Sequence, residues 1–231
     1  DMDMTLLNHA DYKIPDSAIK ALDLLRKNYY IVIATGRDMD AKFSEGLADE
    51  VKPDAIIHLN GNKITIGSEL IYEHCMKREL VEELLHFAEG KDYAIGMTVG
   101  DIDYFVNPWK LLDMPIRTLA YIGREPGTKE VEAAFPMLKL PMFSSREGAD
   151  IIEKDASKAE GLKRLCKAWN IPLKNTIAFG DSMNDYEIVT TAGIGVAMGN
   201  GHPQLKAAAD YVTAPIGEDG VYKACEALHL F

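Results

Sequence analysis

The sequence predicts an α/β fold in which a doubly wound parallel sheet carries a smaller inserted α+β domain. Helical periods alternate with short apolar runs over about the first sixty and the last eighty residues, and such alternation implies parallel strands joined by helices. The middle of the chain shows strands in pairs instead, which is typical of an antiparallel unit. Polar residues gather where the predicted core strands end, the edge at which α/β sheets bind ligands.

The first core segment begins with a helix and a strand. The stretch "PDSAIKALDLLRKN" has apolar residues at helical spacing and a capping Asp16 or Ser17, and "YYIVIATGR" follows as a β-branched run that ends in a turn. A short helix is expected around 42–47. The stretch "DAIIHLNG" then predicts a second buried strand, which stops at Asn60 and Gly61.

The last core segment repeats this pattern. In "SKAEGLKRLCKAWN" the apolar side chains share one helical face, Ser157 precedes them as a candidate cap, and "NTIAFGDSMND" predicts a strand that runs into an acidic turn. Further short strands are expected in "GIGVAMGN" and "DYVTAP", and helices in "HPQLKAAA" and "GVYKACEAL". The segment therefore extends the parallel sheet.

The middle segment predicts the inserted domain. It contains a hairpin around Gly67 and Ser68, an amphipathic helix that ends at Gly90, and two strands around a turn in "YAIGMTVGDIDYFVN". Paired strands with two helices indicate an antiparallel α+β unit. We therefore expect core residues at 1–61 and 149–231, with the inserted domain at 62–148.

Composition narrows the class of partner. The 231 residues are 47% hydrophobic, enough for a sizeable core, and no long uncharged apolar run predicts a membrane span. A net charge of −11 without a basic run argues against nucleic acid. Three scattered cysteines without metal-ligand spacing favour a reducing cytoplasm. The oligomeric state is left open.

Every polar cluster of the core follows a predicted strand or opens a helix. These residues are Asp1, Asp3, Thr35, Gly36, Arg37, Lys158, Asp181, Asn184 and Asp185. Singly, each has an ordinary interpretation: a helix cap, a first-turn charge or a solvated lysine. Together, carboxylates, a hydroxyl and an ammonium at one sheet edge predict a site for a cation and a phosphate.

The stretches "DMDMTLLN", "ATGR", "SKAEGL" and "GDSMNDYEI", in that order, resemble the four motifs of the haloacid dehalogenase (HAD) superfamily. The late insertion after "LNG", with "GVAMGN" and "ADYVTAP", is similar to the Cof-type sugar-phosphate phosphatases of that superfamily. The resemblance covers the whole chain, and four ordered motifs are far more specific than a lone "DxD". It implies a HAD-like Rossmannoid core and an inserted cap.

Phosphoryl transfer gives the two N-terminal carboxylates separate roles. Asp1 is expected to be the nucleophile and to form an aspartyl-phosphate. Asp3 is expected to protonate the leaving oxygen and then to activate water. The acid role requires a raised pKa, and we expect the neighbouring carboxylates to raise the pKa of Asp3.

A magnesium ion is the expected cofactor because Mg²⁺ prefers oxygen ligands. The carboxylates of Asp1 and Asp181 and the main-chain carbonyl of Asp3 are the expected ligands, with Asp185 supporting that shell.

Other residues are expected to hold the phosphate. Thr35, the main-chain amides near Gly36 and Lys158 are assigned to the transferring oxygens, while Asn184 could reach either the phosphate or a metal-bound water. Arg37 could bind phosphate or form an ion pair within the site, and we favour binding. Asn60 and Gly61 form either a simple turn or a linker near the substrate.

Two features depart from the resembled pattern. Members of the family usually carry Gly where this chain has Met4, and a left-handed backbone there would cost on the order of 1 kcal/mol. A short apolar strand also precedes the nucleophile in the resembled fold, so we expect the natural protein to continue upstream of Asp1.

The sequence thus predicts a cytoplasmic, Mg²⁺-dependent phosphatase that hydrolyses a small phosphorylated metabolite, such as a sugar phosphate. Two alternatives remain open. One is a phosphohexomutase-type phosphotransferase, and the other is a non-catalytic sensor that binds a phosphometabolite.

Overall fold

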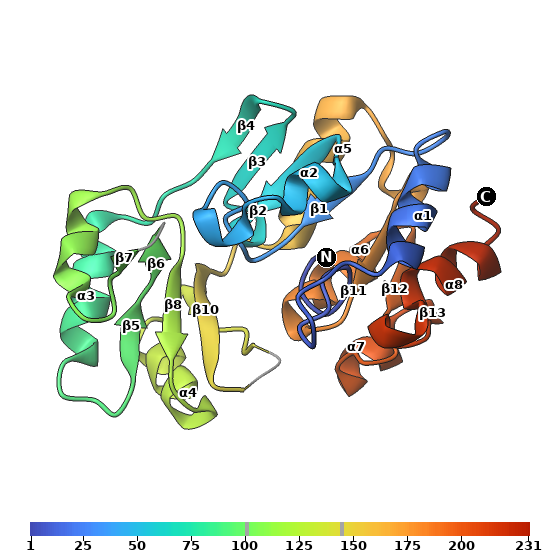
Figure 1. Cartoon of the computed structure of the whole chain (residues 1–231). Helices are drawn as coiled ribbons and strands as arrows, with labels where there is room; N and C mark the ends of the chain where they lie inside the picture. The colour runs from blue at the N-terminus through green and yellow to red at the C-terminus, as the bar shows by residue number, and fades with distance from the viewer. Residues whose placement is uncertain (100–101, 144–145) are drawn as a thin grey trace.

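The computed structural model describes residues 1–99, 102–143 and 146–231. The chain folds into two lobes, seen side by side in Figure 1. One lobe carries the parallel strands with helices on both faces, and the other carries an antiparallel sheet with helices α3 and α4. The predicted fold class, an α/β core with an inserted α+β domain, is confirmed.

Parallel pairing builds the core lobe from two sheets. Strands β1 (Val32–Ala34) and β2 (Ala55–His58) are parallel. The antiparallel hairpin of β3 (Lys63–Ile66) and β4 (Glu69–Glu73) extends them to the order β1-β2-β3-β4. The second sheet is fully parallel and consists of β11 (Ile177–Gly180), β12 (Ile194–Ala197) and β13 (Tyr211–Val212).

Alternation along these strands supplies a hydrophobic cluster on each face. In β1, Ile33 joins one cluster and Ala34 the other; in β11, Phe179 and Ala178 divide in the same way. Successive side chains of a strand point to opposite faces, so both faces need covering. The first cluster is covered by α1 (Asp16–Leu25), α2 (Leu47–Val51) and α8 (Gly220–Ala227), and the second by α5 (Lys158–Trp169), α6 (Tyr186–Thr191) and α7 (Pro203–Ala208).

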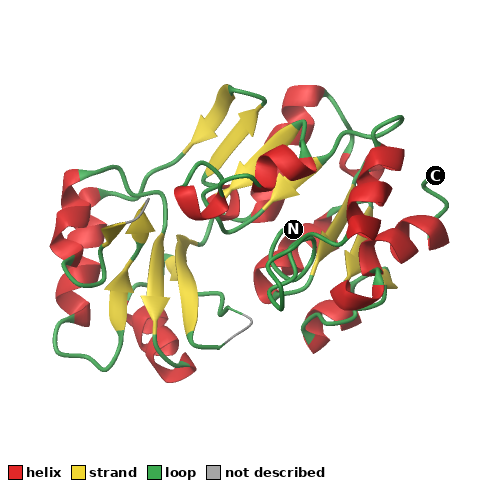
Figure 2. Cartoon of the chain, viewed as in Figure 1, coloured by secondary structure: helices red, strands yellow, loops and turns green. Residues whose placement is uncertain are grey.

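The second lobe is an antiparallel sheet backed by two helices (Figure 2). Its strands run in the order β5-β8-β10-β9, with a further ribbon of β6 and β7. The strands are β5 (Ala94–Gly96), β6 (Thr98–Val99), β7 (Ile102–Asp103), β8 (Leu119–Ile122), β9 (Leu138–Lys139) and β10 (Gly148–Glu153), and the helices are α3 (Arg78–Ala88) and α4 (Glu125–Ala134). The turn expected between β6 and β7 falls on residues 100–101, outside the described residues.

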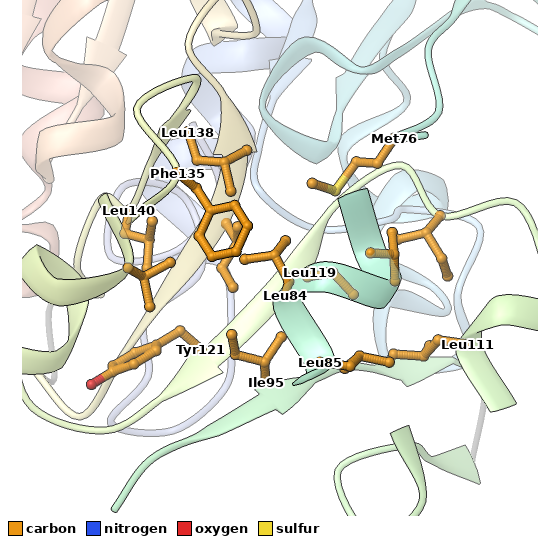
Figure 3. Packing of buried hydrophobic residues seen from close by; sticks show 14 of the residues in the cluster. Met76, Leu84, Leu85, Ile95, Leu111, Leu119, Tyr121, Phe135, Leu138 and Leu140 are labelled. Carbon is orange, nitrogen blue, oxygen red and sulfur yellow. The ribbon is translucent and has the colours of Figure 1, made fainter. Parts of the chain in front are cut away.

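A separate hydrophobic core holds this lobe together. Leu84 of α3 and Leu119 of β8 are almost fully buried, and Figure 3 shows them packed beside Phe135 and Ile95. Truncation of a buried leucine to alanine typically costs about 2–5 kcal/mol. The inserted lobe thus has a hydrophobic core separate from the clusters of the core lobe. This core stabilises the sheet that carries the residues facing the core lobe.

Strand pairing bears on the expected domain boundaries. The β3–β4 hairpin was expected in the inserted domain, yet β3 pairs with β2 of the core sheet. Strand β10 was expected in the core, yet it pairs with β8 and β9. We therefore propose boundaries after β4 and after β10 in place of 61/62 and 148/149.

Two local expectations need correction. The helix expected around 42–47 is divided into a 3-10 turn at Lys42–Ser44 and the α-helix α2, because Gly46 between them has a φ of +82°. Helix α1 has Pro15 at its N-cap without a side-chain cap, and the Ser17 hydroxyl donates to Asp219 instead. Further 3-10 turns lie at Leu59–Gly61, Pro108–Asp113, Leu173–Asn175, Met183–Asp185 and Ile216–Glu218.

Candidate active site

Most of the candidate residues lie where core strands end. Thr35 directly follows β1, and its amide continues the ladder by donating to the carbonyl of Ile57. Asp181 directly follows β11. The main-chain nitrogen of Asp1 donates to the carbonyl of Phe179 at 3.2 Å, which holds the N-terminal segment against β11. The carboxyl ends of the parallel strands β1 and β11 therefore supply the site, as expected for an α/β sheet.

A buried lysine joins two of the expected carboxylates. Lys158 is the first residue of α5, whose cap Ser157 accepts the amide of Glu160. The Lys158 ammonium lies 2.6 Å from Oδ1 of Asp1 and 2.6 Å from Oδ1 of Asp185, and its side chain is fully buried. A buried ammonium is stable only when it is paired, so these contacts are required in the fold and also orient both carboxylates.

Asp185 is held at its other oxygen as well. Oδ2 accepts the main-chain amides of Asp181 at 3.0 Å and Ser182 at 3.1 Å, which closes a capping box at the 3-10 turn Met183–Asp185. Asp181 is also buried. Carboxylate oxygens of Asp1, Asp181 and Asp185 all lie within 4.8 Å of one another. This acidic cluster has the oxygen donors and the excess negative charge that suit a divalent cation.

Arg37 pairs with Asp3, which is the alternative that the sequence favoured less. Its Nε lies 2.8 Å from Oδ2 of Asp3 and its Nη2 lies 2.6 Å from Oδ1. His9, which sequence reasoning did not single out, places Nε2 2.6 Å from the same Oδ1. Arg37 and His9 both lie in loops, so no helical or strand periodicity in the sequence predicted that they pair with Asp3.

The expected raised pKa of Asp3 is wrong. Burial does push this pKa upward, but the hydrogen bond and charge of Arg37, with a smaller effect of His9, bring it below its ordinary value. Opposite charge and hydrogen bonding favour the ionised form of a carboxyl group. Asp3 is therefore a carboxylate in this arrangement.

Asn60, Asn184 and Asp150 form a second polar network. Asn184 Nδ2 donates to Asn60 Oδ1 at 3.1 Å, and Asn60 Nδ2 donates to Asp150 Oδ2 at 2.7 Å. Gly36 lies against the same network, since a Cβ built on it would come within 3.0 Å of Asp150 Oδ2. Thr35 Oγ1 accepts the amide of Arg37, which shapes the turn after β1.

Asp150 was absent from the predicted site. It lies within β10, where an acidic residue reads as one polar position of a strand, and its partner Asn60 is ninety residues away. Burial raises its pKa to about 6, although the Asn60 hydrogen bond and the Lys158 charge oppose this shift and the Asp3 charge adds to it. Perturbed carboxyl groups of this kind gather at functional sites.

Two backbone positions are constrained. Gly61 has a φ of +97°, and a Cβ there would lie 2.2 Å from the carbonyl oxygen of Ser157, so it permits close packing of the linker on the start of α5. Met4 has a φ of +59°. Met4 therefore adopts the left-handed backbone whose cost was considered above, and Asn200 donates to its carbonyl.

A second group of potential ligands is already neutralised. Asp38, Asp40 and His58 offer ligand atoms within 4.8 Å of one another. The Lys63 ammonium, however, contacts both carboxylates, and the His58 ring bonds to the Met39 amide and the Thr65 hydroxyl. This group is best explained as a support for the loop after β1, in which the buried His58 ring packs.

An acidic cluster and a buried lysine at the carboxyl edge of parallel strands are typical of α/β enzymes that handle phosphoryl groups beside a metal ion. Comparison with known families makes the assignment specific. The model described as haloacid dehalogenase-like hydrolase matches residues 1–114 and 98–225. The chain belongs to this family, and as an enzyme it is a HAD-type phosphatase.

Relatives match along nearly the whole length. A Bacillus subtilis (strain 168) protein named "Putative phosphatase YkrA" is 31% identical to this chain, and the match covers 100% of this chain and 96% of that protein. The 5-amino-6-(5-phospho-D-ribitylamino)uracil phosphatase YcsE of the same organism is 28% identical, with 97% of this chain and 92% of YcsE covered.

Among solved structures, the HAD subclass IIB sugar phosphatase BT4131 is similar to this chain with a TM-score of 0.89 and 29% identity, over 100% of this chain and 98% of that one. Within the described residues, no helix is both long and apolar enough to cross a membrane.

Proposed function

We propose that the chain is a Mg²⁺-dependent phosphomonoester hydrolase that acts on a small phosphorylated metabolite through an aspartyl-phosphate at Asp1. The observation that carries this proposal is the buried contact of 2.6 Å between the Lys158 ammonium and the Asp1 carboxylate. This contact supports the nucleophilic role of Asp1, because a fixed positive charge lies beside its carboxylate at the edge where α/β sheets bind ligands. The acidic cluster around Asp1 supplies the metal-binding donors.

The chemistry needs only groups of this site. Asp1 attacks phosphorus, a bond forms between its oxygen and the phosphorus atom, and the bond to the leaving oxygen breaks with its electron pair. Asp3 takes up a proton from solvent once Arg37 turns to the phosphate, and delivers that proton to the leaving oxygen. Water then attacks the aspartyl-phosphate, Asp3 takes the proton of that water, and inorganic phosphate leaves with Asp1 restored. Lys158 balances negative charge on the phosphoryl oxygens during both steps.

The donor set fits magnesium. The carboxylates of Asp1, Asp181 and Asp185 are oxygen ligands within reach of one ion, which is the preference of Mg²⁺. Asp1 and Asp181 would hold the ion, with the Asp3 carbonyl, and Asp185 would support them. When bound, such an ion would neutralise charge on the phosphate. Thr35, the amides near Gly36, and Asn184 are assigned to the phosphate itself.

Sugar phosphates and similar polyol phosphates are the proposed substrate class. The support comes from the relatives, since BT4131 is described as a sugar phosphatase and YcsE is named for a phospho-D-ribityl compound. The inserted domain would exclude water and select the leaving group. Three free cysteine thiols support the cytoplasm as the proposed location.

The test is release of inorganic phosphate from a panel of hexose, pentose, triose, nucleotide and ribityl phosphates, with Mg²⁺ and with chelator. Wild-type protein should release phosphate only with metal. Asp1→Asn should lose at least about a thousandfold in kcat, because it removes the nucleophile. Asp11→Asn, an exposed acid of the same segment, serves as the matched control and should retain wild-type turnover.

Other results would replace this proposal. A bisphosphate that accumulates in place of inorganic phosphate would indicate a phosphotransferase of the mutase type. Binding of a phosphometabolite without turnover of any panel member would indicate a sensor. Full activity of Asp1→Asn would exclude the aspartyl-phosphate.

A further inference from the structure

The carboxyl group of Asp150 reaches the candidate site from the sheet of the inserted domain. Asp150 belongs to β10, which pairs with β8 and β9. Its Oδ2 lies 2.7 Å from Asn60 Nδ2 and would lie 3.0 Å from a Cβ on Gly36. One carboxyl group thus bonds to the loop that follows β2 and lies close to the loop that follows β1.

A chain of hydrogen bonds continues from Asp150 toward the acidic turn. Asn60 Oδ1 accepts Asn184 Nδ2 at 3.1 Å, and Asn184 Oδ1 accepts the Ser182 hydroxyl. An ionised carboxylate can only accept hydrogen bonds, whereas a side-chain amide has one donor end and one acceptor end. The Asp150 carboxylate therefore obliges Asn60 to turn its NH₂ group toward β10 and its oxygen toward Asn184. The Asn60 oxygen in turn orients the side-chain amide of Asn184, because it accepts the Asn184 NH₂ group.

The backbone of Asn60, the middle residue of this hydrogen-bond chain, is held in one conformation. Asn60 has a φ of +53° and a ψ of +34°, a left-handed conformation that asparagine tolerates. Its amide donates to the carbonyl of Thr35 at 3.0 Å, and the residue is almost fully buried. Only the orientation of its side-chain amide remains to be decided, and a buried amide turned the wrong way would leave polar atoms unsatisfied.

We propose that Asp150 is a positioning residue of the hydrolytic site, which orients the amides of Asn60 and Asn184 and so sets Asn184 for the phosphate group. This inference rests on the proposed function, in which Asn184 serves the phosphate. It gives the inserted domain a part at the phosphate end of the substrate in addition to the leaving-group end. The relay is complete only when β10 lies against the loop that carries Asn60.

The test compares Asp150→Ala, Asp150→Asn, Asn60→Ala and the double variant Asp150→Ala/Asn60→Ala. Each alanine variant should lower kcat/KM about tenfold, the usual effect of losing one hydrogen bond to a charged group. The double variant should lose no more than about twofold beyond either single variant, because both act through one relay. Asp150→Asn can still offer an oxygen to Asn60 and should stay within about threefold of wild type.

Glu82→Ala is the matched control. Glu82 is an exposed acid on helix α3 of the same domain, so its loss should leave kcat/KM unchanged. Thermal unfolding of every variant checks that the fold is kept. Calorimetric binding of inorganic phosphate adds a readout that needs no turnover, and Asp150→Ala should weaken this binding by a similar factor.

Several outcomes would overturn the inference. These are wild-type kinetics in a folded Asp150→Ala, effects of Asp150→Ala and Asn60→Ala that multiply in the double variant, and an Asp150→Asn as impaired as Asp150→Ala. The last result would mean that the charge of Asp150, and not its orientation of Asn60, matters. Failure of the proposed function is distinct: wild-type protein would then release no phosphate, while the phosphate-binding comparison would still decide the relay.

Discussion

Arg37 holds the carboxylate of Asp3 in a two-pronged contact, with Nε 2.8 Å from Oδ2 and Nη2 2.6 Å from Oδ1. A planar guanidinium matches a carboxylate in this geometry better than any other cation. The residue proposed to donate a proton is thus held in its deprotonated form until Arg37 finds another partner. The phosphate oxygens of an incoming substrate are the natural alternative acceptors.

Removal of Arg37 should therefore change the pH dependence of catalysis. In Arg37→Ala the remaining burial raises the pKa of Asp3, because the largest opposing contribution is gone. The limb of the kcat/KM profile that reports Asp3 should move to higher pH. His9→Gln should move it less. An unchanged profile in Arg37→Ala would show that Asp3 does not titrate in the measured range.

Lys158→Met should destabilise the fold, because it removes the positive charge that balances the acidic cluster. Two carboxylates 2.6 Å from a buried ammonium would lose their partner, which typically costs about 3–5 kcal/mol. Urea unfolding in chelator should record this loss, and Mg²⁺ should recover part of it because a cation again faces the carboxylates. Lys163→Met, on the exposed face of the same helix, should change stability by less than about 0.5 kcal/mol.

Substitutions at Met4 should measure the free-energy cost of its left-handed backbone. Met4→Gly and Met4→Ala remove the same packing, but only alanine keeps a Cβ at a φ of +59°. The glycine variant should be more stable than the alanine variant by about 1 kcal/mol. At the helical position Lys163 the order should reverse by a similar amount. Equal stability of the two Met4 variants would mean that the left-handed backbone carries no strain.

Gly61→Ala should be strongly destabilising. It combines a φ of +97° with an approach of 2.2 Å to the Ser157 carbonyl, for a total of roughly 3 kcal/mol. Since Ser157 precedes Lys158, turnover should fall as well. Gly67→Ala is the control, because Gly67 has a φ of +55° with no described atom within 4 Å and should cost only about 1 kcal/mol. Comparable losses in the two variants would contradict the steric argument.

Local signals predicted much of this fold. The cap Ser157 and the apolar face behind it predicted α5, and the turn at Gly67 and Ser68 predicted the β3–β4 hairpin. The neighbour of that hairpin was not predicted, because alternation along a strand does not say which strand lies beside it. Pairing with β2 is a contact between segments, and periodicity carries no information on it.

The same limit applies to the candidate site. Asp1, Asp185 and Lys158 were expected together from their motifs, and they meet. The partner of Asp3 was harder to foresee, because the carboxylates beside it in sequence matter less than Arg37, which arrives from another strand end. Asp150 gave no local signal at all. Residues whose role depends on a partner far away in the sequence are the ones that a single chain conceals.

With the boundaries proposed above, the inserted domain is joined to the core by two connections of four residues each, between β4 and α3 and between β10 and α5. Four residues reach at most about 14 Å when fully extended, and His74 of the first connection bonds to Glu153, the residue directly before the second. A paired, short attachment of this kind resists translation and leaves rotation about its own axis as the soft motion. We therefore expect the inserted domain to rotate about the two connections together, and the second connection leads directly to Lys158.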